Sequence, residues 1–203
     1  MPSITSLEQL RALYAEPTER AIKKQLAKLD RHCRSFIALS PYLVVCTSDV
    51  DGNLDASPRG GTPGFCKVAD DSMVLMPDRP GNNRLDSFSN IIGTGRIGML
   101  FFVPGVDEML RVNGTAELRT DEALRAQCIE QGKTPHVVVA VKVREAYLHC
   151  AKAIMRSKLW KPEAQVPRSV LPTMGQMIND QSGGATVVES QETMVERYKT
   201  QLF

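Results

Sequence analysis

Apolar residues gather in short runs along the middle of the chain, and such runs predict β-strands. These runs occupy 42–47, 72–76, 96–103, 108–118 and 137–143. Turn residues at 49–53 predict a hairpin whose second strand is 54–57, and Gly114 marks a bulge or a close approach of two backbones. Because the strands are closely spaced and do not repeat as βαβ units, they favour an antiparallel barrel decorated by helices.

Helical spacing of apolar residues is clearest toward the two ends of the chain. Residues 6–33 predict a helix interrupted at Pro17, and residues 36–39 predict a short strand or turn. Further helices are predicted at 85–92, 121–131 and 169–203, the last one divided at 182–184. Residues 150–160 predict a helix or a tight turn. The chain thus divides into an N-terminal helical segment, a barrel domain and a C-terminal helical extension, with bounds 1–34, 35–160 and 161–203.

Composition narrows the class of protein. Hydrophobic residues make up 42% and charged residues 24% of the 203 positions, and the net charge is +2, so no strong field favours nucleic acid or an anionic membrane. The sequence shows neither an apolar run of about 20 residues nor a secretory leader pattern. Five scattered cysteines without a CxxC pair suit reduced thiols rather than a metal site. We therefore expect a cytoplasmic protein with no metal, nucleic-acid or membrane partner.

The segment 77–84, Pro-Asp-Arg-Pro-Gly-Asn-Asn-Arg, lies between a predicted strand and a predicted helix. The first turn of a helix leaves N–H groups without partners, and its dipole attracts negative charge. With Arg79 and Arg84 added, these groups form a candidate phosphate site. The alternative is an ordinary capped helix with solvated arginines.

The segment 55–61, Asp-Ala-Ser-Pro-Arg-Gly-Gly, follows the predicted hairpin turn. Proline and two glycines allow a backbone to approach a ligand closely, and Ser57 and Arg59 can bind an anion. The alternative is a surface turn with an exposed arginine.

A third unusual stretch is 150–160, which contains the only tryptophan of the chain. Lys152, Arg156 and Trp160 follow the helical i, i+4, i+8 spacing, so one helix face would present two cations and an indole. The alternative is an amphipathic helix with Trp160 in the core.

Other candidate chemistries find little support. Arg111 lies in an apolar strand and is expected to face solvent or pair with a carboxylate. The three histidines are far apart and have no carboxylate at metal-ligand spacing. The chain has no G-x-S-x-G elbow, no Walker A lysine and no G-x-G-x-x-G fingerprint. No residue is assigned as catalytic.

Taken together, the motifs resemble those of the pyridoxamine 5'-phosphate oxidase-like proteins over residues 36–160. The matching elements are the Ser-Pro-Arg-Gly-Gly strand, the Pro-Asp-Arg-Pro-Gly-Asn-Asn-Arg loop, Gly-Met-Leu-Phe-Phe-Val-Pro-Gly, Leu-Arg-Val-Asn-Gly, His-Cys-Ala-Lys and Arg-Ser-Lys-Leu-Trp. The resemblance implies a mainly β (α+β) fold, a split antiparallel β-barrel of the FMN-binding type with flanking helices and a helical C-terminal tail. It also implies a homodimer with FMN at the subunit interface.

The resemblance further implies which residues bind the cofactor. In the family, the matching strand and loop hold the flavin phosphate and ribityl chain, and a basic and an aromatic residue approach the flavin from the partner chain. The implied residues are Ser57, Arg59, Met76, Pro77, Asp78, Asn82, Asn83 and Arg84. The candidates from the partner chain are Trp160 as the aromatic residue and Lys152 or Arg156 as the basic one.

The chain also departs from the authentic oxidase. That enzyme has an Arg-x-x-Leu-Leu-Lys type strand where this chain has Asp-Ala-Ser-Pro-Arg-Gly, and an Arg-Lys pair where this chain has Asn-Asn-Arg. The C-terminal elements that hold pyridoxal phosphate are not evident. We therefore expect an FMN-dependent oxidoreductase acting on an unidentified small molecule. The alternative is a non-catalytic flavin-binding barrel, or one for haem or a deazaflavin, with a sensing, storage or partner-binding role.

Overall fold

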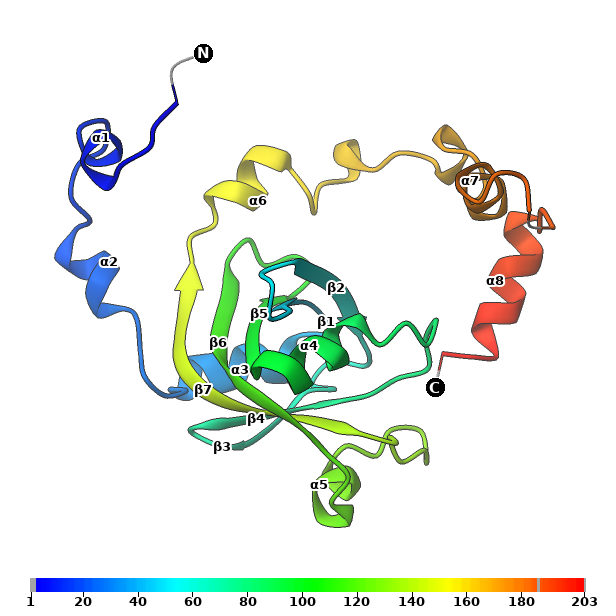
Figure 1. Ribbon diagram of the computed structural model, residues 1–203, viewed down its shortest axis with the longest axis horizontal. Helices are drawn as coiled ribbons and strands as arrows, with labels where there is room; N and C mark the ends of the chain where they lie inside the picture. The colour runs from blue at the N-terminus through cyan, green and yellow to red at the C-terminus, as the bar shows by residue number, and fades with distance from the viewer. Residues whose placement is uncertain (1–2, 186, 203) are drawn as a thin grey trace.

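The computed structural model describes residues 3–185 and 187–202. Its centre is one seven-stranded sheet in the order β2-β1-β5-β6-β7-β4-β3, in which every neighbouring pair is antiparallel. The strands are β1 (Tyr42–Ser48), β2 (Leu54–Gly60), β3 (Lys67–Asp70), β4 (Met73–Pro77), β5 (Arg96–Phe102), β6 (Met109–Arg119) and β7 (Val138–His149). The sheet bends strongly on itself without closing (Figure 1).

The strands predicted from residue 42 onward are confirmed, and β3 is an addition that the short apolar pattern did not reveal. The predicted hairpin is β1–β2, and β2 continues past Ser57 to Gly60. Pro58 is tolerated there because β2 is an edge strand, where a missing N–H need not break a ladder.

Strands β6 and β7 form the long central pair of the sheet. Their register runs from Met109↔His149 to Arg119↔Val138 and shifts between Asn113 and Gly114, which confirms the predicted bulge. A Cβ at position 114 would overlap the carbonyl oxygen of Lys142, so glycine is required by the close approach of the two backbones.

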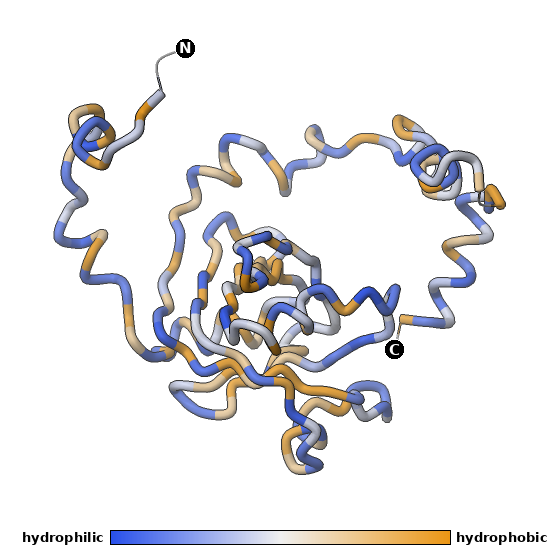
Figure 2. Tube along the Cα trace, in the orientation of Figure 1, coloured by the Kyte–Doolittle hydropathy of each residue, from blue (hydrophilic) through white to orange (hydrophobic). Residues whose placement is uncertain are grey.

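The concave side of the sheet holds the main core. Helix α3 (Arg31–Leu39) and helix α4 (Asp86–Thr94) contribute Ile37 and Ile91 to it. Strand side chains such as Leu43 and Phe101 are fully buried there. Figure 2 shows hydrophobic positions concentrated along the strands that cross at the base of the sheet, with mixed character along both ends of the chain.

The N-terminal region differs from the continuous helix predicted for 6–33. It contains α1 (Leu7–Arg11) and α2 (Glu19–Lys23), and α3 then includes residues 36–39, which were predicted as a strand or turn. A new N-cap causes the change, because Asp30 Oδ1 accepts a hydrogen bond from the Cys33 N–H at 2.8 Å. Between α2 and α3, Leu26 pairs in extended form with Ala146 of β7.

The remaining helices match their predicted positions but are shorter. They are α5 (Glu122–Gln127), α6 (Lys152–Ser157), α7 (Met174–Gln181) and α8 (Gln191–Lys199), with 3₁₀ turns at Pro162–Ala164 and Arg168–Val170. Asp121 stands at the N-cap of α5 without a capping bond, because its carboxylate binds Arg119 at 2.7 Å instead.

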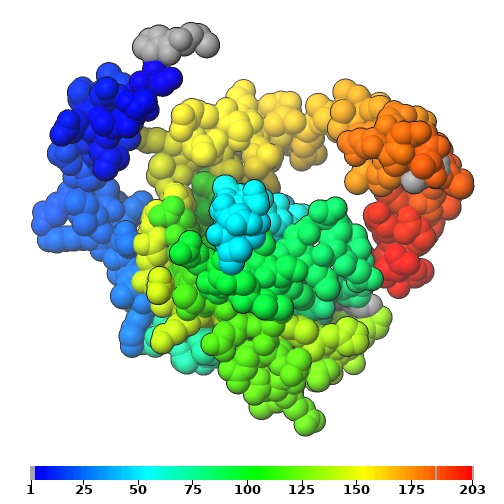
Figure 3. All heavy atoms as spheres, in the orientation of Figure 1, coloured from blue at the N-terminus to red at the C-terminus, as the bar shows by residue number. Residues whose placement is uncertain are grey.

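The two ends of the chain form arms beside the barrel (Figure 3). Helices α7 and α8 contact each other, and Arg197 of α8 binds Glu189 at 2.7 Å. Both arms expose apolar side chains such as Leu7 and Leu171. The division into 1–34, 35–160 and 161–203 stays a prediction. Within the described residues, no helix is long and apolar enough to cross a membrane.

Candidate functional site

The edge strand β2 carries polar side chains on the face that elsewhere forms the core. Its register places Arg59 opposite Leu43 and Asp55 opposite Thr47, and cross-strand partners share a face of the sheet. Leu43 and Thr47 are buried, so the side chains of Asp55, Ser57 and Arg59 point to the concave side. Helix α4 packs over this edge and contacts both β1 and β2.

The start of α4 is open and conformationally unusual. Leu85, its N-cap, has φ 60° and makes no side-chain capping bond. Asn83 also lies in the left-handed region, with φ 58°. Such conformations cost free energy in residues other than glycine and often mark ligand sites. The Arg84 N–H donates to Asn82 Oδ1 at 3.0 Å, which holds the turn just before the helix.

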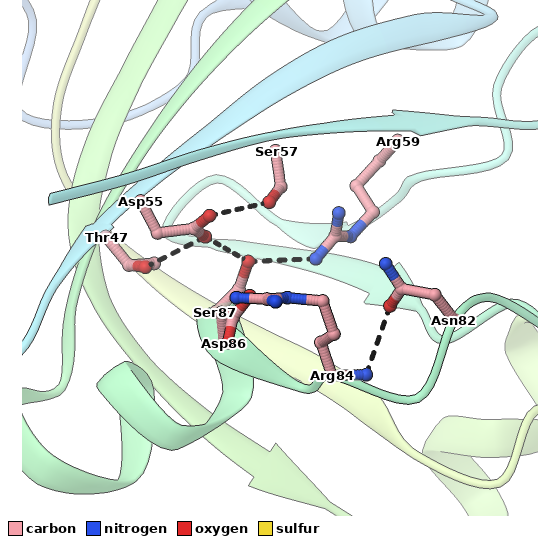
Figure 4. A network of polar contacts seen from close by, with 8 residues as sticks. All are labelled: Thr47, Asp55, Ser57, Arg59, Asn82, Arg84, Asp86 and Ser87. Carbon is pink, nitrogen blue, oxygen red and sulfur yellow. Dashed lines mark hydrogen bonds and ion pairs between the residues drawn. The ribbon is translucent and has the colours of Figure 1, made fainter. Parts of the chain in front are cut away.

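A polar network joins β2 to α4, with Asp55 at its centre (Figure 4). The buried Ser87 hydroxyl donates to Asp55 Oδ2 at 2.5 Å and accepts from Arg59 Nη2 at 2.9 Å. The Ser57 hydroxyl donates to Asp55 Oδ1 at 2.7 Å, and Thr47 Oγ1 lies 3.4 Å from Asp55 Oδ2. Asp55 therefore occupies the hydroxyl donors of the candidate phosphate site.

Two arginines and an amide complete the cluster. In Figure 4 the side chains of Arg59, Asn82 and Arg84 point toward the space beside Ser87. Arg84 is largely exposed, and its Nε donates to Asp86 Oδ2 at 2.8 Å. The hydrogen bond and charge of Asp86 raise the pKa of Arg84, and the charge of Asp55 adds to this effect.

The carboxyl groups around the cluster have opposite pKa shifts. Partial burial would raise the pKa of Asp55, but hydrogen bonds from Ser87, Ser57 and Thr47 and the charge of Arg59 outweigh it and lower that pKa. For Asp78, burial dominates and raises the pKa despite the Arg79 N–H and nearby positive charges.

Arg79, predicted as part of the phosphate site, has another role in the structure. Its guanidinium forms a largely buried ion pair with Glu130, which follows α5. Glu130 Oε1 also accepts from the Thr62 N–H at 2.9 Å and from the Thr62 hydroxyl. These contacts tie the loop after β4 to two distant segments. Glu130 carried no signal in the sequence because it lies 51 positions from Arg79.

Met76, Pro77 and Asp78 lead from β4 into the same loop. The side chains of Met76 and Pro77 are buried, and their backbones pair with β7. The Asp78 N–H donates to the carbonyl of Val137 at 2.9 Å. Contact of Met76 or Pro77 with a ligand would therefore involve the backbone.

The predicted helix face of Lys152, Arg156 and Trp160 does not form as expected. Helix α6 ends at Ser157 and Lys158 has φ 51°, so the helical spacing from Lys152 and Arg156 does not extend to Trp160. Trp160 is not in the core either, and its Nε1 donates to the carbonyl of Val106 at 2.9 Å. Among the described residues, these three make no hydrogen bond or ion pair with β2 or with the start of α4.

Arg111 behaves as expected from the sequence. Its Nη2 lies 3.3 Å from Glu145 Oε1, and its guanidinium stacks 4.3 Å from the ring centre of Tyr147. Residues 3–185 and 187–202 contain no group of three His, Cys, Asp or Glu side chains arranged to hold a metal ion.

The family model for pyridoxamine 5'-phosphate oxidase matches residues 29–150, more than half of the chain. The chain therefore belongs to the pyridoxamine 5'-phosphate oxidase family. Its fold is the split barrel of that family, which confirms the mainly β (α+β) prediction. A search of curated proteins gives no match.

Solved structures of bacterial proteins are similar to the chain. HupZ of Group A Streptococcus is 20% identical, with a TM-score of 0.48, covering 58% of this chain and 91% of its own. A Lactobacillus delbrueckii protein with a provisional pyridoxamine 5'-phosphate oxidase name is 22% identical, with a TM-score of 0.48, covering 61% and 98%. An FMN-binding protein of Syntrophomonas wolfei is 12% identical, with a TM-score of 0.45, covering 58% and 83%.

The chemistry of the cluster suits a phosphate ester. Guanidinium groups, hydroxyls, an amide and an uncapped helix start are the groups that proteins use to hold phosphate. All are present in Ser57, Arg59, Asn82, Arg84 and the first turn of α4. The two carboxylates of the cluster, on Asp55 and Asp86, already bind some of these donors, so an incoming phosphate must compete for them.

Proposed function

We propose that the chain binds FMN, with the phosphate in the cluster where β2 meets α4. The observation that carries this proposal is the convergence of Ser57 and Arg59 from an edge strand with Arg84 and an uncapped helix start. The two segments are separated in sequence and meet only through the fold. Membership of the pyridoxamine 5'-phosphate oxidase family supports a flavin as the phosphate ester.

In this proposal the protein is an FMN-dependent oxidoreductase for a small molecule. The bound flavin would supply hydride or electron transfer, and the chain would supply binding, orientation and hydrogen bonds. Asn82 and Asn83 would contact the ribityl chain or phosphate, and Met76 to Asp78 would line the same groove.

We further propose that the protein works as a homodimer. Among the described residues, no hydrogen bond or ion pair joins Lys152, Arg156 or Trp160 to the candidate phosphate site of the same chain. If they approach the flavin, a second copy has to bring them there. Sedimentation of the purified protein at several concentrations tests this, and a monomer at all concentrations that bind FMN would contradict it.

The cofactor proposal predicts a loss of affinity when either arginine is removed. Hydrogen bonds to charged groups contribute about 1.5–3 kcal/mol each, so Arg59→Ala and Arg84→Ala should each raise the Kd for FMN by about 10- to 150-fold. Quenching of flavin fluorescence during titration gives the Kd. Arg20→Ala in the exposed helix α2 is the matched control and should bind like wild type.

Two outcomes would decide against parts of this proposal. If the two site variants bind FMN as wild type does, the phosphate lies elsewhere. If FMN binds as expected but neither NADH nor NADPH reduces it, the non-catalytic flavin-binding role replaces the oxidoreductase role.

A further inference from the structure

The candidate phosphate site contains an anion of its own, the carboxylate of Asp55. Asp55 accepts hydrogen bonds from Ser57 and Ser87, and Thr47 lies within reach of the same carboxylate. Its pKa is held below the ordinary value, so the group is charged near neutral pH. An isolated surface carboxylate would have water as its partner, whereas this one has the donors expected to serve a ligand.

The hydroxyl of Ser87 links this anion to Arg59. A serine hydroxyl has one proton, and that proton goes to Asp55, so the oxygen accepts from Arg59 Nη2. Arg59, Ser87 and Asp55 therefore form a chain from a positive to a negative end. Part of the attraction that Arg59 offers to a ligand is already balanced inside the protein.

We infer that Asp55 determines ligand specificity by opposing the charge of a doubly ionised phosphate monoester. The inference rests on the proposed function, because it concerns the same cluster. A dianion that enters beside Ser87 faces Arg59 and Arg84 but also the fixed charge of Asp55, and like charges at close range disfavour binding. The wild-type site therefore binds a dianionic phosphate less tightly than Arg59 and Arg84 alone would.

The alternative role for Asp55 is purely positional. In that role the carboxylate holds Ser57, Ser87 and Arg59 in place for the phosphate, and its removal weakens binding. The two roles give opposite signs for the change in FMN affinity, so one substitution separates them.

The test compares Asp55→Asn with wild type, using FMN and uncharged riboflavin as probes at one pH and one salt concentration. Asparagine keeps the shape of the side chain, and the serine hydroxyls can rotate to suit it. We expect the Kd for FMN to fall by about tenfold or more, because a like charge is removed, while the Kd for riboflavin changes by less than about twofold. Asp51→Asn, in the exposed turn after β1, is the matched control and should change neither Kd.

An unchanged or higher Kd for FMN in Asp55→Asn overturns the inference, and so does an equal change for FMN and riboflavin. Asp55→Ala provides a second neutral variant, and thermal unfolding of both variants shows whether they fold. If wild type binds FMN and Arg59→Ala weakens it, but neither Asp55 variant binds more tightly, this inference alone fails. If no variant binds FMN at all, the proposed function fails with it.

Discussion

Neighbouring carboxyl groups differ in character because their local partners differ. Asp55 lies among hydroxyl donors and an arginine, which stabilise its charged form and lower its pKa. Asp78 is half-buried, and burial raises its pKa even though positive groups lie nearby. Near neutral pH, the charged form of Asp55 therefore stabilises the fold, whereas the charged form of Asp78 destabilises it.

The raised pKa of Asp78 predicts how its removal changes stability. Its folded-state pKa lies above the unfolded value of about 3.9, so the folded state binds the proton more tightly and loses stability as pH rises between the two values. Asp78→Asn should therefore unfold at a higher temperature than wild type near neutral pH. The difference should disappear below about pH 3.9, where the carboxyl is protonated in both states.

Thermal unfolding of both proteins across this pH range provides the measurement. Asp70→Asn, at the exposed end of β3, is a control for the loss of one negative charge. A difference of the same size at acid and neutral pH would show that the carboxyl charge is not the cause.

At the scale of elements, the β6–β7 pair depends on one glycine. A side chain at position 114 would overlap the Lys142 carbonyl, which belongs to backbone and cannot move aside without breaking the bulge. Gly114→Ala should lower the free energy of unfolding by about 1–3 kcal/mol, as overpacking does in a core.

The matched control is Gly93→Ala within α4. A Cβ there meets Val50 at an ordinary contact distance of 3.6 Å, and alanine in a helix is more stable than glycine by about 0.5–1 kcal/mol. Urea unfolding of the two variants should move in opposite directions. Equal stability of Gly114→Ala and wild type would contradict the assignment of the bulge.

The elements also show which parts of the fold the sequence reveals. Runs of aliphatic and aromatic residues identify β1, β5 and β7, because buried strands need such residues. The sequence does not reveal helix α3, because its N-cap at Asp30 lies within a longer apolar stripe that predicts one continuous helix.

The candidate site was partly predictable for a similar reason. Ser57, Arg59 and Arg84 stand in local motifs that predict an anion site, and the structure brings them to one edge of the sheet. The ion pair of Arg79 with Glu130 and the central place of Asp55 depend on register and on contacts between distant segments, which local patterns do not contain.

At the scale of the whole molecule, the barrel and the arms have different character. The barrel has a continuous core between its bent sheet and helices α3 and α4. The arms expose apolar residues and stand beside the barrel (Figures 1 and 3). The candidate phosphate site lies at the edge of the barrel, where the proposed homodimer would share a ligand between two copies.

In the proposed function, the flavin phosphate lies between β2 and the start of α4. Phosphorus NMR of FMN bound to the wild-type protein tests this position. A phosphate monoester loses its second proton at about pH 6, and contact with guanidinium groups favours the dianion. We expect a bound resonance that is distinct from free FMN, does not titrate around that pH, and is lost or shifted toward free FMN in Arg59→Ala. A bound phosphate that titrates like free FMN, or one unaffected by Arg59→Ala, would contradict the claim.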